Sequence, residues 1–302
     1  MNNAAPAELA LFIIASLVIF AGLARLALHF FLHVNVAEKI GEEHNAALGI
    51  EYAGYFLGVL LIAGSVLDGL PDISASGGGD AGGGMFSSGF WSNALQAGAY
   101  GVFGIVALAL LGHLGFRLII RSNIVAGVRA NNQAAGLVAA GGHISAALVI
   151  AGVLSGDSAG GDFSVAGVFL VIGIAALWGI TYIHRFVTRY DDAREITNGN
   201  VAAALSYAGM MIAIGIIVGH AVNGDFSDYA TSLGLCGKAL LSIFILYPVR
   251  QFIVQGILLG DGFRLYGGRL DDEISRDGNV GAGAVEAAAF IAAALFALQV
   301  SY

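Results

Sequence analysis

Long apolar stretches alternate with short polar ones along the whole chain. Eight of the stretches approach the ~20 residues that a helix rising 1.5 Å per residue needs to cross a bilayer. They are Leu9–Leu32, Ala46–Leu67, Phe90–Phe116, Gln133–Leu154, Phe163–His184, Val201–Val222, Thr231–Ile253 and Val280–Val300. A backbone in lipid must form its hydrogen bonds internally, and these stretches lack the alternating polarity of barrel strands. The pattern therefore predicts an all-α, polytopic membrane protein of about eight transmembrane helices.

The composition fits a chain surrounded by lipid. Of its 302 residues, 58% are hydrophobic and 11% are charged, whereas soluble domains carry about 25% charged residues. A water-soluble fold of this composition would lack polar residues to cover its surface. The formal charge of −8 argues against nucleic acid as a partner, because that role needs clustered Lys and Arg. The single cysteine, Cys236, allows no disulfide framework within one chain.

The polar connections between the apolar stretches fall into two classes. The loops after the second, fourth and sixth stretches are acidic and contain neither Lys nor Arg. The loops after the first, third, fifth and seventh stretches are basic. Their basic residues are Lys39, Arg117, Arg121, Arg129, Arg185, Arg189, Arg194, Arg264, Arg269 and Arg276. The positive-inside rule predicts that the basic loops are cytoplasmic, so both termini are expected on the outer side of the membrane.

Aligning the basic loops reveals an internal repeat of four helical hairpins. Each loop ends on an asparagine that precedes a run of small residues. These asparagines are Asn45, Asn132, Asn200 and Asn279. An asparagine before a run of helix formers is typical of an N-cap, and small residues let a neighbouring helix approach closely. Capping and packing therefore explain the motif without any bound substrate. Because each repeat holds two helices, all four repeats should share one orientation in the membrane.

Two motifs in the second half resemble a known family. The stretch Glu195–Ala204 reads Glu-Ile-x-x-x-Asn-x-Ala-Ala-Ala, and Glu273–Asn279 reads Glu-Ile-x-x-Asp-x-Asn, with Glu286 following inside the last helix. This half is similar to the YjfL-like family of bacterial inner-membrane proteins, which is built on a domain of unknown function. The resemblance implies two four-helix units, 1–160 and 161–302, in a bacterial inner membrane. It also implies an association with a cytoplasmic stress-response protein. In that membrane, the outer side on which the loop charges place both termini is the periplasmic side.

Two carboxylates lie inside the predicted helices. Glu51 follows Asn45 by six residues and Glu286 follows Asn279 by seven, which places each carboxylate roughly 10 Å inside its helix. A carboxylate at this depth is costly unless it is paired, protonated or hydrated, and intramembrane acids often mark ion or proton paths. The same side chains could instead form hydrogen bonds that hold helices together. The sequence leaves both interpretations open.

Three basic residues also lie within the predicted helices. Arg25 is expected to pair with Glu51, because the first two helices form a hairpin. Lys238 and Arg250 belong to the seventh helix, and Arg250 could reach Glu286 if that helix bends at Pro248. Otherwise Lys238 and Arg250 are expected to extend towards opposite membrane surfaces.

The sequence predicts neither an enzyme nor a cofactor. It contains no nucleophile elbow, no phosphate-binding loop and no paired-carboxylate hydrolase motif. His29 and His33 lie one turn apart but have no cysteine or carboxylate at ligand spacing, so no metal site is expected.

Two functions remain after this exclusion. The first is a channel or carrier for a small cation or proton, with Glu51, Glu286, Arg25, Lys238 and Arg250 as candidates for the path. The second is a membrane scaffold or envelope-stress partner, whose basic loops would contact a cytoplasmic protein or anionic lipid. The sequence does not predict an oligomeric state.

Overall fold

A computed structural model of the chain describes residues 4–32, 35–68, 88–119, 123–155, 163–184, 186–224, 226–264 and 266–300. Within these ranges all regular structure is helical, and eight helical segments are long and apolar enough to cross a membrane. The segments are α1 (Ala4–Leu32), α3 (Ala46–Asp68), α4 (Ser88–Ile119), α6 (Gln133–Leu154), α7 (Phe163–His184), α9 (Val201–Val222), α10 to η3 (Tyr229–Leu258) and α13 (Val280–Val300). The predicted all-α, polytopic membrane fold is confirmed.

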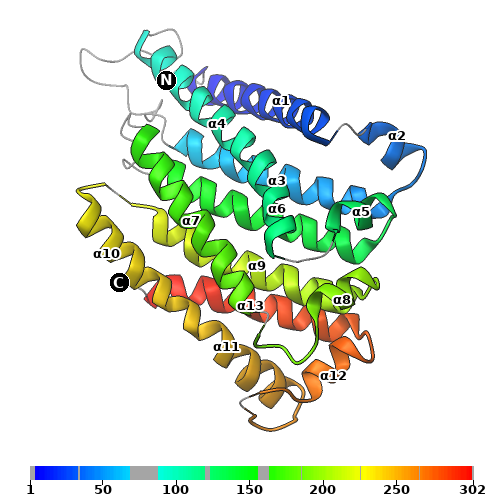
Figure 1. Cartoon of the computed structure of the whole chain (residues 1–302). Coiled ribbons are helices and arrows are strands. Elements are labelled where there is room, and N and C mark those ends of the chain that lie inside the picture. The colour runs from blue at the N-terminus through cyan, green and yellow to red at the C-terminus, as the bar shows by residue number, and fades with distance from the viewer. Residues whose placement is uncertain are drawn as a thin grey trace.

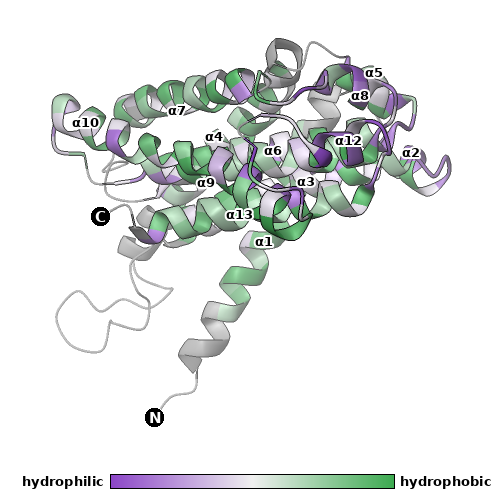
Figure 2. Cartoon of the chain, turned by 90° about the horizontal axis from the view of Figure 1, so that it is seen from below, coloured by the Kyte–Doolittle hydropathy of each residue, from purple (hydrophilic) through white to green (hydrophobic). Residues whose placement is uncertain are grey.

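Four short helices, which the hydropathy pattern does not predict, occupy the basic loops. They are α2 (Val36–Gly41), α5 (Ile124–Arg129), α8 (Asp192–Thr197) and α12 (Arg269–Ser275). Each short helix precedes one of the four repeat asparagines. Figure 2 shows all four at the same end of the helical bundle, where hydrophilic residues gather. This end is called the short-helix end below.

The second helices of the four hairpins form a row in the order α3, α6, α9 and α13 (Figure 1). The first helices of the hairpins cover this row. Helix α4 packs against α3 and α6, and α7 packs against α6 and α9. The segment from α10 to η3 packs against α9 and α13, and α1 contacts α3 and α4. The fold is therefore one repeated arrangement, in which each new hairpin adds to the row left by the one before.

Neighbouring helices of the row touch through the same pair of positions at all three junctions. A glycine nine residues after one repeat asparagine lies against an alanine eight residues after the next. The pairs are Gly54 with Ala140, Gly141 with Ala208, and Gly209 with Ala287. A β-carbon on any of the three glycines would overlap the facing alanine. In lipid, where apolar burial does not drive helices together, such close backbone contact is a main source of association.

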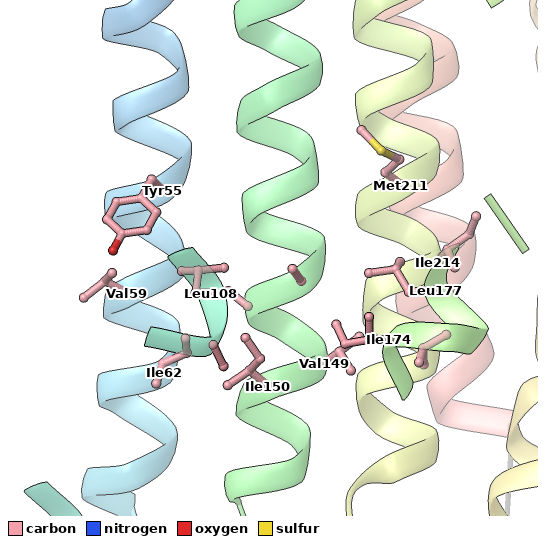
Figure 3. Packing of buried hydrophobic residues seen from close by; sticks show 14 of the residues in the cluster. Tyr55, Val59, Ile62, Leu108, Val149, Ile150, Ile174, Leu177, Met211 and Ile214 are labelled. Carbon is pink, nitrogen blue, oxygen red and sulfur yellow. The ribbon is translucent and has the colours of Figure 1, made fainter. Parts of the chain in front are cut away.

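Larger side chains fill the space where the covering helices meet the row. Figure 3 shows two such groups at similar depth. One group joins α3, α4 and α6, and the other joins α6, α7 and α9. The residues are Tyr55, Val59, Ile62, Leu108 and Ile150 in the first group, and Val149, Ile174, Leu177, Met211 and Ile214 in the second. The apolar core therefore runs through both halves of the chain without a break.

The seventh membrane segment is not the single α-helix that the sequence predicted over Thr231–Ile253. It consists of α10 (Tyr229–Leu240), a 3₁₀ segment η2 (Leu241–Ile245), α11 (Leu246–Pro248) and a π-helix η3 (Val249–Leu258). Pro248 has no backbone N–H to donate, which weakens regular α-helical bonding at this point. π-Helices are rare and often occur at functional sites. The π-helix buries Arg250, Gln251, Val254 and Gln255.

The row junctions should be sensitive to added volume. Replacing Gly209 by valine should lower the free energy of unfolding by about 1–3 kcal/mol or more, because overpacking forces two backbones apart. Gly179 of α7 is exposed and has nothing within 4 Å of a β-carbon, so Gly179→Val is the matched control. Thermal unfolding in detergent measures both effects. Equal loss of stability in the two variants would contradict the packing account.

Candidate functional site

The repeat asparagines do more than cap helices. The Oδ1 atom of each accepts a hydrogen bond from the backbone three residues later, at 2.8–3.2 Å, as the sequence predicted. The side-chain amides of the first three also donate across a row junction. The bonds run from Asn45 to the carbonyl of Val128 (3.0 Å), from Asn132 to Ile196 (2.9 Å) and from Asn200 to Ile274 (2.9 Å). Each of these carbonyls belongs to the short helix of the next repeat, so the asparagines fasten neighbouring repeats together.

The fourth asparagine forms no bond to another repeat among the described residues. Asn279 donates to the Glu273 carboxylate of its own repeat at 2.8 Å, as Asn200 does to Glu195 at 2.9 Å. The bond from Asn279 lowers the pKa of Glu273, and the bond from Arg269 lowers it further. Asn279 is exposed, whereas Asn45 is buried. The sequence signalled the capping role of all four residues but not the bridge between repeats.

Glu286 of α13 belongs to a buried ion-pair cluster. Arg250 Nε donates to Glu286 Oε1 at 2.5 Å, and Ser206 Oγ donates to Glu286 Oε2 at 2.5 Å. The other face of the Arg250 guanidinium binds Asp271 of α12 and, at 2.9 Å, the side-chain oxygen of Gln251. Arg250 is 0% exposed and Glu286 is 1% exposed. The pairing of Arg250 with Glu286 that the sequence suggested is present, and the π-helix is the element that delivers the arginine.

The cluster carries more acidic than basic groups. Two carboxylates face one guanidinium, and Asp271 Oδ2 is buried without a hydrogen-bond partner among the described residues. The hydroxyl of Tyr190 is similarly buried without a partner there. Burial raises the pKa of Tyr190 well above its usual value, and the nearby Glu286 raises it further. Tyr190 therefore keeps its proton and can act only as a neutral hydrogen-bonding group.

Glu51 of α3 faces a histidine instead of the expected arginine. Its carboxylate Oε1 lies 3.6 Å from His143 Nε2 of α6, and the two residues are 6% and 0% exposed. The Tyr55 ring stands edge-on to the imidazole, with centroids 5.3 Å apart. On the α4 side Gly112 touches the imidazole, because a β-carbon there would overlap His143 Nδ1. The absence of a side chain at Gly112 thus gives His143 its place between three helices.

The other predicted path residues lie apart from the two buried sites. Arg25 is exposed on α1, and it forms no ion pair or hydrogen bond within the described ranges. The expected pair of Arg25 with Glu51 is therefore not formed. The reason is the orientation of α1, which turns Ala24 and Ala27 inward. Lys238 is exposed on α10, which leaves it on the outside of the bundle.

A small cavity lies where four of the membrane helices meet. It has a volume of about 20 Å³ and lies between α4, α6, α7 and α9, where Gly112, Ser145, Trp178 and Thr181 are among its lining residues. The Thr181 hydroxyl is buried and has no hydrogen-bond partner in the part of the chain that the structure describes. The lining of the cavity is mostly apolar, with Ser145, Trp178 and Thr181 as the polar side chains. No pattern in the sequence predicts this site, because its residues come from four separate helices.

The comparisons with known proteins identify the repeated domain. The family described as Domain of Unknown Function (DUF350) matches the chain twice, over residues 1–154 and 158–299. This confirms the expectation of two units of a membrane domain of unknown function. Searches of curated proteins and of solved structures found no match. The α6–α9 junction joins the two units through Gly141 and Ala208, and the equivalent glycine–alanine contact occurs within each unit.

Loss of an asparagine bridge should cost more than loss of a cap alone. Asn132→Ala removes the cap and the bond to Ile196, so we expect it to lower the free energy of unfolding by about 1.5–3 kcal/mol. Asn279→Ala removes a cap without a bridge to another repeat, so it should cost about 1 kcal/mol. Unfolding midpoints of the two variants in the same detergent provide the comparison. A larger loss for Asn279→Ala would be inconsistent with the bridging role.

Removing the arginine of the ion-pair cluster alone should cost more stability than removing the arginine together with both carboxylates. Arg250→Met leaves two buried carboxylates without a cation, and we expect a loss of about 3–5 kcal/mol in stability. Adding Glu286→Gln and Asp271→Asn removes the uncompensated charge and should recover part of the loss. Thermal unfolding of the single and triple variants tests this order. A triple variant less stable than Arg250→Met would refute the charge-compensation account.

Proposed function

The chain belongs to the DUF350 family, and we propose that it moves protons, or a small cation, across the membrane at its intramembrane carboxylates. The observation that carries this proposal is the buried pair of Glu51 and His143. Both side chains can bind and release a proton, and both lie within membrane-spanning helices. Polar ionisable groups are costly in this environment and are usually retained for function.

The proposed path begins at the short-helix end. Glu51 lies two turns inside α3 and exchanges a proton with the solvent-facing end of the bundle. The carboxylate then passes the proton to Nε2 of His143, a step for which 3.6 Å needs only a slight approach of the two groups. An imidazole can release a proton from its second nitrogen, so it can relay protons between two sides. Gly112 contacts the imidazole and also lines the small cavity, so a water bonded to Thr181 there would receive the proton.

The Arg250 cluster takes a different role in this proposal. Glu286 is held by Arg250 and Ser206 through bonds of 2.5 Å, so its carboxylate is committed to contacts within the protein. We assign the cluster to fixing the π-helix against α12 and α13. Arg25 and Lys238 face outward and are assigned no part in the path.

The proposed setting is a bacterial inner membrane, with the short-helix end in the cytoplasm. The support is the charge of the loops, since the basic residues are confined to that end of the hairpins. Both termini would then be periplasmic. We propose no enzymatic activity, because transfer of a proton along this path makes and breaks no other bond.

A flux assay tests the proposal. The full chain, reconstituted in liposomes that contain a pH-sensitive dye, should acidify or alkalinise the interior when a membrane potential is applied. Glu51→Gln should reduce proton flux to the level of protein-free liposomes, because the amide cannot take up the proton. The matched control is Glu273→Gln, which alters a carboxylate outside the membrane-spanning helices. Wild-type flux in a folded Glu51→Gln variant would disprove the path, and parallel assays with sodium and potassium identify a cation.

The alternative is a scaffold or envelope-stress partner that binds a cytoplasmic protein through the basic loops. Three exposed arginines of the second unit are already paired with acids of their own loops. The pairs are Arg264 with Asp261, Arg269 with Glu273, and Arg276 with Asp277. This pairing reduces the charge available to a partner, and it is the reason for preferring transport. A wild-type protein without any proton or cation flux would favour the scaffold.

A further inference from the structure

Among the described residues, the row of four helices ends on two faces that no other repeat covers. Within the row, the position nine residues after one asparagine meets the position eight residues after the next. The residue nine positions after the last asparagine is Ala288 on α13, and the residue eight positions after the first asparagine is Ala53 on α3. Both residues are exposed. The two ends of the row therefore present the two unmatched halves of one contact. They are called the α13 edge and the α3 edge.

A second contact of the row repeats in the same way. Gly136, four residues after Asn132, packs on the backbone of Ala47, two residues after Asn45. In the same way Gly283, four residues after Asn279, packs on the backbone of Ala202, two residues after Asn200. At the α3 edge the corresponding residue is Gly49, which has nothing within 4 Å of a β-carbon. At the α13 edge the counterpart is Gly281, which is exposed. Both edges thus keep the small residues that the internal junctions use.

The polar contacts at the two edges match as well. Asn200 donates to the carbonyl of Ile274 in the following short helix. In α2 the residue equivalent to Ile274 is Ile40, which lies five residues before its asparagine just as Ile274 does. Among the described residues, Asn279 donates to no carbonyl of another repeat, and no asparagine donates to Ile40. The donor on one edge and the acceptor on the other are therefore available to a neighbouring copy.

Helix α1 also occupies an incomplete position. Each later covering segment packs against two helices of the row, whereas among the described residues α1 packs against α3 and the covering helix α4. Its outward residues Leu11, Ile14, Val18 and Ile19 are exposed. So is Arg25, and a charged group facing the hydrocarbon is unfavourable. A row helix from another copy, placed beside α3, would give α1 the groove that its counterparts already occupy.

We infer that copies of this chain dock head to tail, with the α13 edge of one against the α3 edge of the next. The chain already contains this junction, since α6 of the first unit and α9 of the second meet in the same way. Docking of this kind keeps every copy in one orientation across the membrane. Because the two edges differ, the contact is heterologous and forms a ring or an open row of copies. Ala288 stands where the internal junctions have glycine, so the copies sit slightly further apart than the repeats do.

Disulfide cross-linking in native membranes tests the register. In a Cys236→Ser background, one tagged copy carries Ala288→Cys and a differently tagged copy carries Ala53→Cys. Oxidation should produce a mixed dimer only when both copies are expressed together. Each single variant alone should remain monomeric on a denaturing gel. The matched control combines Val171→Cys with Phe244→Cys, two exposed positions on the covering helices.

The cross-linking result shows whether a second copy or lipid covers the two edges. A mixed dimer well above the control supports the inference. Cross-linking no stronger than the control would show that lipid covers both edges, which overturns it. Equally efficient dimers of Ala53→Cys alone would show a two-fold arrangement and would also overturn it.

A second variant tests the same interface without cysteine chemistry. Gly49→Leu adds volume where the chain itself has open space, so the unfolding midpoint of the monomer should be unchanged. The variant should nevertheless lose the assemblies of several copies that the wild type forms in lipid nanodiscs, measured by mass photometry. A wild type that contains a single copy, or a variant that assembles normally, would contradict the inference. Neither result depends on whether the protein conducts protons.

Discussion

Close contact between the backbones of α3, α6, α9 and α13 is the constraint on which the rest of the structure depends. Lipid offers no hydrophobic driving force between apolar helices, so the row needs contacts that lipid cannot replace. The glycine and alanine pairs provide one kind, and the asparagine bridges provide the other. Both kinds recur at the same positions of each repeat. The glycines and alanines at these junctions are therefore a structural requirement as much as a consequence of the solvent.

The two buried carboxylates show how neighbouring positions of the repeat, six and seven residues after the asparagine, can acquire different chemistry. Glu51 and Glu286 lie at nearly the same depth in their helices. Glu286 meets Arg250 because a π-helix turns that arginine inward, whereas Glu51 meets His143 because Gly112 leaves room for the ring. A proton moves less easily to or from a carboxylate that a guanidinium holds than to or from a carboxylate beside an imidazole. This difference is the reason for assigning structure to the second half and transport to the first.

The sequence predicted the features that depend on local pattern. The membrane helices follow from length and hydropathy, and their starting points follow from the asparagine caps, as at Val201 and Val280. The pairing of Arg250 with Glu286 was foreseeable because Pro248 indicated a departure from the α-helix. Asp271 was missed because α12 is too short to show a helical period. The pair of Glu51 and His143 depends on which helices become neighbours, and no periodicity within one helix carries that information.

The position of Glu51 is the central claim, since both the proposed path and the difference between the two halves depend on it. An experimental structure of the full chain in lipid nanodiscs, at a resolution that shows side chains, tests it most directly. The account predicts density for the Glu51 carboxylate between α3 and α6, facing the His143 imidazole. A carboxylate that instead faces lipid, or that reaches Arg25 on α1, would contradict it.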